Sequence, residues 1–159
     1  MSGPYYPIAV KVKDEPVLIA GGGKVSERKA KTLLALGAKV KIVSPEITAG
    51  LKRFVSRRRV KWIRRKIRLS DLAYAKVIIA ATSDPSVNRK ISWWAQRRGI
   101  LVNVVDDAKL STFISPAIFA AAKALIAVYT QGQDPVLSRD LKNFIEDNWD
   151  VFLSYRNRL

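Results

Sequence analysis

The stretch Val17-Leu18-Ile19-Ala20-Gly21-Gly22-Gly23-Lys24-Val25-Ser26 decides the fold of this 159-residue chain. Its first four residues are all apolar, which predicts a short buried strand of a parallel sheet. The strand runs directly into Gly21-x-Gly23-x-x-Ser26, where Gly21 permits a tight turn and Gly23 lets the backbone approach a ligand closely. Ser26 replaces the usual third glycine or alanine and is still small enough for close packing. The motif therefore predicts that N–H groups at a helix N-terminus face the phosphates of a dinucleotide.

The residues after this turn complete a strand–helix–strand unit. Apolar side chains recur at helical spacing as far as Leu36, and Gly37 provides a C-terminal stop. Residues 40–43 predict the next strand of the unit. Elsewhere we expect strands at 8–12, 60–63, 77–81 and 100–105, and helices at 47–55 and 87–98. Strands that alternate with helices in this way predict an α/β fold, a Rossmann-like doubly wound parallel sheet.

The pattern changes near residue 113. Residues 112–117 and 125–130 predict two further strands, and Asp134-Pro135 opens a last helix that continues to about Phe152. We therefore expect a dinucleotide-binding domain over residues 1–113 and a small α+β segment over residues 114–159. The second part is too small to fold alone, which predicts that it takes part in dimerisation.

The composition excludes several kinds of chemistry. The chain has no cysteine and no histidine, so thiol catalysis, disulfides, histidine bases and the usual zinc sites are absent. Any proton transfer must use Asp, Glu, Lys, Tyr or water, and we expect no metal held by the protein. The apolar runs are too short to span a bilayer, and the first residues lack the regions of a signal peptide. These features predict a soluble cytoplasmic protein with no membrane partner.

The charge balance points to a polyanionic partner. Lys and Arg total 29 against 13 Asp and Glu, a formal charge of +16. Nucleic acid, an anionic membrane or a small molecule with many carboxylates would each suit this excess. Ten of the basic residues lie between Lys52 and Arg68, where there is no acid and where Trp62 is interleaved. This run can bind nucleic acid, or it can be a solvated face that keeps the protein soluble.

Polar residues follow the strand at 40–43, at the edge of the sheet where ligands bind. The tip of this strand is Ser44-Pro45-Glu46. Ser44 can hydrogen-bond a ribose, and Glu46 either supplies the ribose acid two residues late or is an ordinary acid in a first helical turn. Because there is no Asp at the tip, the spacing does not distinguish NAD from NADP.

Two more polar pairs lie at the same edge. Asp84 and Asn88 follow the strand at 77–81, where helix capping is the alternative to a binding role. Asp106 and Asp107 end the strand at 100–105, where a carboxylate can face the crevice beside a nicotinamide or belong to a solvated turn. Because adjacent side chains of an extended chain point in opposite directions, we expect only one of the two to face the crevice.

Five stretches together share their order and spacing with one family. They are 17–25 with Arg28-Lys29-Ala30, 43–46, 80–84 with Asn88, 103–107, and 113–117. Over about residues 6–150 the chain resembles the precorrin-2 dehydrogenase and sirohydrochlorin ferrochelatase family, the siroheme synthase N-terminal module. The resemblance implies NAD-dependent oxidation of precorrin-2 to sirohydrochlorin in siroheme biosynthesis, followed in some members by Fe²⁺ insertion. It also implies a homodimer, with the segment after the Rossmann-like domain at the interface and over the substrate.

The resemblance also implies roles for particular residues. Gly21, Gly23, Lys24 and Val25 match the phosphate turn, Ser44, Pro45 and Glu46 match the ribose edge, Thr82 matches the nicotinamide side, and Asp106 matches the essential aspartate. Precorrin-2 carries eight carboxylates, so a protein of charge +16 would attract it. Asp106 is then the expected general base in dehydrogenation and the acceptor of pyrrole protons in metal insertion.

Two departures from the family and two other functions stay open. The family has a Ser- and Gly-rich turn where this chain has residues 130–135, Thr-Gln-Gly-Gln-Asp-Pro, and many members continue into a further helical segment. A non-catalytic dinucleotide-sensing domain would keep the glycine turn without needing Asn103-Val104-Val105-Asp106 and the stretch at 113–117. A basic nucleic-acid-binding protein would instead depend on the run from Lys52 to Arg68.

Overall fold

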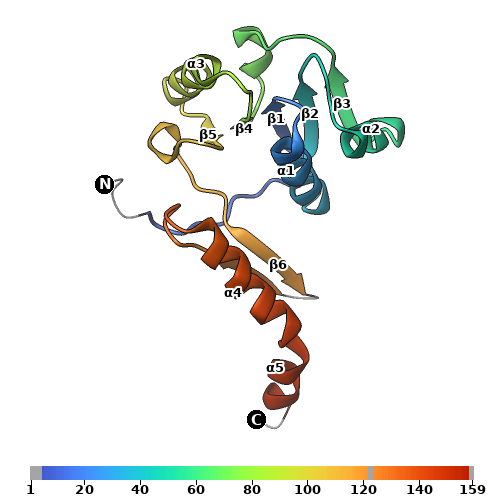
Figure 1. Ribbon diagram of the computed structural model, residues 1–159, viewed down its shortest axis with the longest axis vertical. Helices are drawn as coiled ribbons and strands as arrows, with labels where there is room; N and C mark the ends of the chain where they lie inside the picture. The colour runs from blue at the N-terminus through green and yellow to red at the C-terminus, as the bar shows by residue number, and fades with distance from the viewer. Residues whose placement is uncertain (1–4, 122–123, 158–159) are drawn as a thin grey trace. The chain divides into compact units, whose positions relative to one another are not determined.

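The computed structural model describes residues 5–121 and 124–157. The chain divides into two compact units, Met1–Phe113 and Ile114–Leu159. Each unit has its own sheet, five-stranded in the first and two-stranded in the second (Figure 1). The candidate residues named above all belong to the first unit.

The sheet of the first unit is entirely parallel. Its strands are β1 (Pro16–Ala20), β2 (Lys39–Val43), β3 (Val60–Ile63), β4 (Val77–Ala80) and β5 (Leu101–Val104). Their order in the sheet is β3-β2-β1-β4-β5, so the chain winds outward first on one side of β1 and then on the other. Such a reversal opens a crevice at the carboxyl ends of β1 and β4, where α/β sheets bind their ligands.

Helices cover both faces of this sheet. One apolar cluster joins alternate residues of β1, β2 and β4 to α1 (Lys24–Ala35) and α2 (Ala49–Ser56). The other cluster joins the opposite set of strand residues to α3 (Pro85–Gln96) and the short 3₁₀ turn η1 (Leu69–Leu72). Because both faces are buried, the central strands β1 and β4 are continuously apolar from Val17 to Ala20 and from Val77 to Ala80. The predicted doubly wound α/β fold is confirmed.

The free edge of β5 is covered by the segment that follows the 3₁₀ turn η2 (Ala108–Leu110). The backbone N–H of Thr112 donates to the Val102 carbonyl at 2.8 Å, and the Val102 N–H donates to the Thr112 hydroxyl at 2.8 Å. Ser111 forms a similar side-chain bond with Val104. A strand edge that is satisfied in this way cannot pair with another chain.

Two predicted strands are wrong. In the predicted strand at 112–117, Thr112 bonds to β5 through its N–H and its hydroxyl, the Phe113 carbonyl accepts from the Asn103 amide, and regular strand structure begins only at Ala117. Residues 8–12 alternate in polarity but have no strand partner among the described residues. Instead the chain turns at Asp14, whose φ is 63° and whose N–H donates to the Gly37 carbonyl. Alternation of polarity along a segment does not by itself provide a partner strand.

The second unit is a hairpin with two helices. β6 (Ala117–Ala121) pairs antiparallel with β7 (Ala124–Val128), and α4 (Pro135–Asp147) packs on both strands. Asp134 caps α4, because its carboxylate accepts from the Leu137 N–H at 2.8 Å. The predicted single helix to residue 152 is wrong in its extent: it breaks at Asn148, and α5 (Trp149–Arg156) follows. No helix in the described ranges combines the length and apolar character needed to cross a bilayer.

Candidate functional site

The candidate site lies where four loops meet at the carboxyl edge of the sheet. The strands run in register, with Ala20 opposite both Val43 and Ala80, and Ala80 opposite Val104. The residues that follow each strand therefore emerge side by side. This places the glycine turn, the tip at Ser44, the turn at Thr82 and the aspartate pair on one edge.

The turn after β1 needs glycine at Gly21 for a local reason. The φ of Gly21 is +113°, and a Cβ atom there would lie 2.1 Å from the Ala81 carbonyl oxygen. Its N–H donates to the Val43 carbonyl at 3.0 Å. Gly21 therefore allows the chain to turn in close contact with the ends of both neighbouring strands, β2 and β4.

Gly22 was missed by sequence reasoning, although it stands between the two expected glycines. A Cβ atom on Gly22 would lie 1.9 Å from the Glu46 carbonyl oxygen. The Gly22 carbonyl also accepts a hydrogen bond of 3.0 Å from the Thr48 N–H. Gly22 therefore serves protein packing rather than ligand approach.

Gly23 faces open space. A Cβ atom on Gly23 would have no neighbour within 4 Å, and the residue is the N-cap of α1 without any side-chain cap. The N–H groups of the first turn, at Lys24 and Val25, precede the first intrahelical bond, in which Glu27 donates to the Gly23 carbonyl. An uncapped helix N-terminus with room above it is suited to an anion.

Ser26 packs where the motif requires a small residue. It is completely buried, and its hydroxyl has no hydrogen-bond partner in the described part of the chain. Glu27, which follows it, reaches the start of α2: Thr48 donates to its carboxylate, and Gly50 leaves room for it. A carboxylate at a helix N-terminus is favourable, so Glu27 helps to join α1 to α2.

The tip of β2 is held by its backbone. The Ser44 N–H donates to Ile63 at 3.2 Å, and the Ser44 carbonyl accepts from the Trp62 indole at 2.9 Å. Pro45 and Glu46 are exposed beside it. Because α2 begins at Ala49 with Thr48 as its cap, Glu46 is not an acid of the first helical turn. The alternative interpretation of Glu46 is therefore wrong.

Thr82 belongs to a turn that Asn88 holds in place. The hydroxyl of Thr82 donates to the Asn88 side-chain oxygen at 2.7 Å, and the Asn88 amide donates back to the Thr82 carbonyl at 3.1 Å. Asn88 is only 1% exposed, so it acts within the protein. Asp84 caps α3, and hydrogen bonds from Ser86 hold the pKa of its carboxyl below the usual value. The contacts of Asp84 are therefore those of a helix cap, which was the alternative to a binding role.

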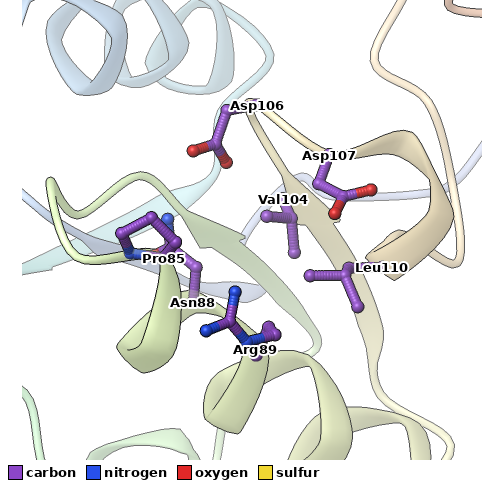
Figure 2. A pocket seen from close by; sticks show the side chains of 7 residues that line it. All are labelled: Pro85, Asn88, Arg89, Val104, Asp106, Asp107 and Leu110. Atoms are coloured by element: carbon purple, nitrogen blue, oxygen red, sulfur yellow. The ribbon is translucent and has the colours of Figure 1, made fainter.

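Asp106 and Asp107 lie in a pocket of about 200 Å³ at the end of β5. Figure 2 shows the two carboxylates diverging, with Asp106 directed toward Pro85 and Asp107 toward Leu110. Both residues line this pocket, and that only one of them faces the cofactor crevice stays a prediction. They differ in their bonds: Asp107 accepts from the Lys109 N–H at 2.9 Å and caps η2. Asp106 is exposed, without a hydrogen-bond partner among the described residues.

In the basic run from Lys52 to Arg68, one side chain, that of Arg65, pairs with a buried carboxylate, and the others are exposed. Arg65 binds the Asp71 carboxylate through two hydrogen bonds, of 2.7 and 2.6 Å. Asp71 is only 7% exposed. The Arg65 guanidinium lowers the pKa of its carboxyl most, and the backbone N–H of Arg68 lowers it further. The other nine basic side chains are exposed. Trp62, in the same run, is half-buried and uses its indole N–H to bond Ser44.

Most of the chain matches a known family. Residues 8–117 match the family model described as "Putative NAD(P)-binding". The siroheme synthase of Chromobacterium violaceum is 39% identical over 142 residues, which are 89% of this chain and 30% of that protein. The siroheme synthase of Methylobacillus flagellatus is 41% identical over 140 residues, 88% of this chain and 30% of that protein. The chain thus spans under a third of the length of these relatives.

A solved structure is similar across both units. It is SirC, a precorrin-2 dehydrogenase, with a TM-score of 0.77 and 26% sequence identity. The similarity covers 91% of this chain and 71% of that one. It therefore extends beyond the parallel sheet into the residues that follow Phe113.

Proposed function

Because this chain belongs to the NAD(P)-binding family shared by siroheme synthases and precorrin-2 dehydrogenase, we propose that it oxidises precorrin-2 to sirohydrochlorin with NAD. One observation carries the proposal. The exposed carboxylate of Asp106 lies on the same sheet edge as the open N-terminus of α1. A domain that only sensed a dinucleotide would need the open helix N-terminus but not the exposed carboxylate of Asp106.

The residues at this edge fit a dinucleotide. The uncapped first turn of α1 offers N–H groups to a pyrophosphate, and the open space over Gly23 gives it room. We propose that the pyrophosphate binds at Gly21, Gly23, Lys24 and Val25, the ribose at Ser44, Pro45 and Glu46, and the nicotinamide side at Thr82. Bound NAD supplies the acceptor for the hydride.

The protein's own part in the reaction is to position the substrate and take a proton. Oxidation removes two hydrogens from the macrocycle: one leaves as a hydride to the cofactor and one as a proton to a base. Asp106 suits the base, since its carboxylate is exposed in the pocket while that of Asp107 caps η2. The chain has no histidine and no cysteine to compete for this role.

The decisive experiment is anaerobic incubation of the purified chain with precorrin-2 and NAD. We expect the absorbance spectrum of sirohydrochlorin to appear together with stoichiometric NADH. NAD binding without turnover under the same conditions would refute the proposed oxidation and favour a sensing domain. Omitting NAD is the control, because spontaneous oxidation of the substrate by residual oxygen would continue without it.

We also propose that the second unit joins two copies of the chain. Its helices, β7 and the residue after β7 expose many large apolar side chains: Leu125, Tyr129, Val136, Leu137, Leu141, Phe144, Val151, Phe152 and Tyr155. Exposed apolar side chains in this number favour an interface, and a unit of this size needs additional burial to be stable. A second copy of the same unit would supply that burial through a self-complementary contact.

Iron insertion is proposed as a second step at the same pocket, with Fe²⁺ as a substrate. Fe²⁺ displaces two protons from the pyrrole nitrogens, and the Asp106 carboxylate can accept them in turn and release them to solvent. The described residues contain no group of three or more metal-binding side chains, so the macrocycle would provide the ligands. Adding Fe²⁺ after sirohydrochlorin has formed should produce the siroheme spectrum faster than the protein-free control.

A further inference from the structure

Helix α3 carries a basic and aromatic stripe beside the Asp106 pocket. Arg89, Trp93 and Arg97 recur at four-residue spacing, which places them on one face of the helix. Both arginines are exposed, and Trp93 is 59% exposed, unusually high for so large an apolar side chain. From Arg89 to Arg97 the helix rises about 12 Å, at about 1.5 Å per residue.

The charges of this stripe have no partner in the described part of the protein. No carboxylate there forms an ion pair with Arg89 or Arg97. The Arg97 guanidinium lies 4.5 Å from the centroid of the Trp93 ring, in cation–π geometry. Stacking restrains the arginine while its N–H groups stay available for an anion.

The stripe borders a depression that continues the Asp106 pocket. The depression has a volume of about 370 Å³ and is lined by Arg89, Ser92, Trp93, Gln96, Arg97 and Leu110. Arg89 and Leu110 also line the pocket that holds Asp106. Figure 2 shows Arg89 on α3 facing the strand end that carries the two aspartates. The two hollows therefore form one surface from Asp106 to Arg97.

The floor of the depression is fixed by hydrogen bonds. The buried Ser92 hydroxyl donates to the Leu110 carbonyl, and the Gln96 amide donates to the Ser92 hydroxyl at 2.8 Å. These bonds join α3 to the η2 segment next to the aspartates. The spacing between the stripe and Asp106 is thereby set before any ligand arrives.

We propose that the Arg89–Trp93–Arg97 stripe is a docking subsite for the carboxylate arms of an anionic tetrapyrrole. The inference rests on the proposed function, because it takes the macrocycle to react at Asp106. Arginine binds carboxylates through paired N–H donors, and the indole face packs against an apolar ring edge. The subsite places at least two carboxylates on α3 and orients the ring toward the pocket.

Binding can be tested without turnover. Uroporphyrin, which also carries eight carboxylates, is titrated into the protein while tryptophan fluorescence and the Soret band are followed. We expect Arg89→Gln and Arg97→Gln each to raise the Kd about threefold and the double variant about tenfold, as suits exposed ion pairs. Arg98→Gln is the matched control, since Arg98 stacks instead on the buried Trp94 at 3.9 Å. Its Kd should stay within twofold of the parent.

Two further measurements separate this subsite from the proposed reaction. Trp93→Phe should remove most of the fluorescence quenching, and NAD affinity should be unchanged in every variant. If the parent oxidises precorrin-2 and the double variant keeps its KM and its Kd for uroporphyrin, the subsite is refuted and the enzyme is not. If the double variant loses uroporphyrin binding while the parent shows no turnover, the subsite stands and the proposed oxidation fails. A parent that does not bind uroporphyrin refutes the subsite.

Discussion

The carbonyl oxygen of Glu46 lies where a side chain on Gly22 would begin, 1.9 Å from the position of its Cβ atom. This contact joins the glycine turn after β1 to the loop after β2. The Thr48 N–H, which donates to the Gly22 carbonyl at 3.0 Å, completes the connection. The two loops proposed to hold the pyrophosphate and the ribose are therefore packed against each other. Gly22 makes this packing possible, whereas the adjacent Gly23 leaves space for a ligand.

Substitutions at Gly22 and Gly23 should separate those two roles. Gly23→Val meets no protein atom within 4 Å, so we expect a folded protein whose NAD affinity falls at least about tenfold, about 1.4 kcal/mol. Gly22→Ala instead meets backbone, and we expect it to lower the free energy of unfolding by about 2 kcal/mol. Calorimetry and thermal melts measure the two effects. Unchanged NAD affinity in folded Gly23→Val would remove the glycine turn from the cofactor site.

The Arg65–Asp71 pair should stabilise the chain except in acid. The pKa of Asp71 is held below its usual value, chiefly by Arg65, so its contribution is complete above about pH 5 and is lost as the pH falls through the lowered pKa. Asp71→Asn should cost about 1 to 3 kcal/mol at pH 7, because the buried carboxylate loses its charge-assisted hydrogen bonds, while the partly exposed Arg65 keeps contact with solvent. Urea unfolding at pH 7 and pH 3 should show the cost shrinking in acid. Asp140→Asn, in an exposed pair with Arg139, should cost less than about 1 kcal/mol.

Lys29 should oppose stability at neutral pH. Burial, aided by the charge of Arg28, lowers the pKa of Lys29 to about 8. The unfolded chain then binds more protons than the folded one between about pH 8 and 10.5, so stability should rise with pH across that window. Lys29→Met should remove this slope and stabilise the protein at pH 7 by about 1 to 3 kcal/mol. Lys31→Met changes an exposed residue of the same helix and should do neither.

Dimerisation should depend on the apolar surface of the second unit. Phe144 on α4 is 64% exposed, and Phe144→Asp places a charge within the proposed interface. Light scattering at micromolar concentration should report twice the 17.8 kDa chain mass for the parent and a smaller mass for this variant. Tyr74→Asp is the control, because Tyr74 is 85% exposed but belongs to the first unit. A parent that stays monomeric across this range would contradict the proposal.

The parallel sheet was predictable because its evidence is local and repeated. β1 and β4 are short, wholly apolar runs, the other strands are mainly apolar, and the glycine motif after Val17–Ala20 identifies the central strand. The exchange of hydrogen bonds that replaces a strand at residues 112–117 depends on the free edge of β5, far from any local pattern. The break at Asn148 is similar: its side-chain amide bonds the Phe144 carbonyl, as a helix end does, in a stretch with ordinary helical spacing.

The candidate site was predictable to the level of its loops but not of its individual contacts. Sequence position placed Asp84, Asp106 and Asp107 at the carboxyl edge, and the parallel register confirms that edge. Gly22 must be glycine because of the Glu46 carbonyl, 24 residues further along the chain, and no rule of motif spacing predicts that contact. The difference between Asp106 and Asp107 likewise depends on η2, because the Lys109 N–H donates to the Asp107 carboxylate and leaves that of Asp106 exposed.

That difference gives the sharpest prediction, that Asp106 carries the proton chemistry. Asp106 ends β5 in the pocket with an exposed carboxylate, whereas Asp107 has a structural duty at η2. Asp106→Asn keeps the shape of the side chain and removes the base, and loss of a general base typically slows a reaction about 10²- to 10⁴-fold. We expect Asp106→Asn to bind NAD normally and to lose dehydrogenase turnover at least about a hundredfold. Asp107→Asn keeps an oxygen that can accept from Lys109, so its turnover should fall far less. Both variants are compared by NAD calorimetry, thermal melting and the sirohydrochlorin spectrum, so that misfolding is seen separately from lost chemistry. Turnover of Asp106→Asn within threefold of the parent, or an inactive Asp107→Asn that folds and binds NAD, would mean that the base lies elsewhere.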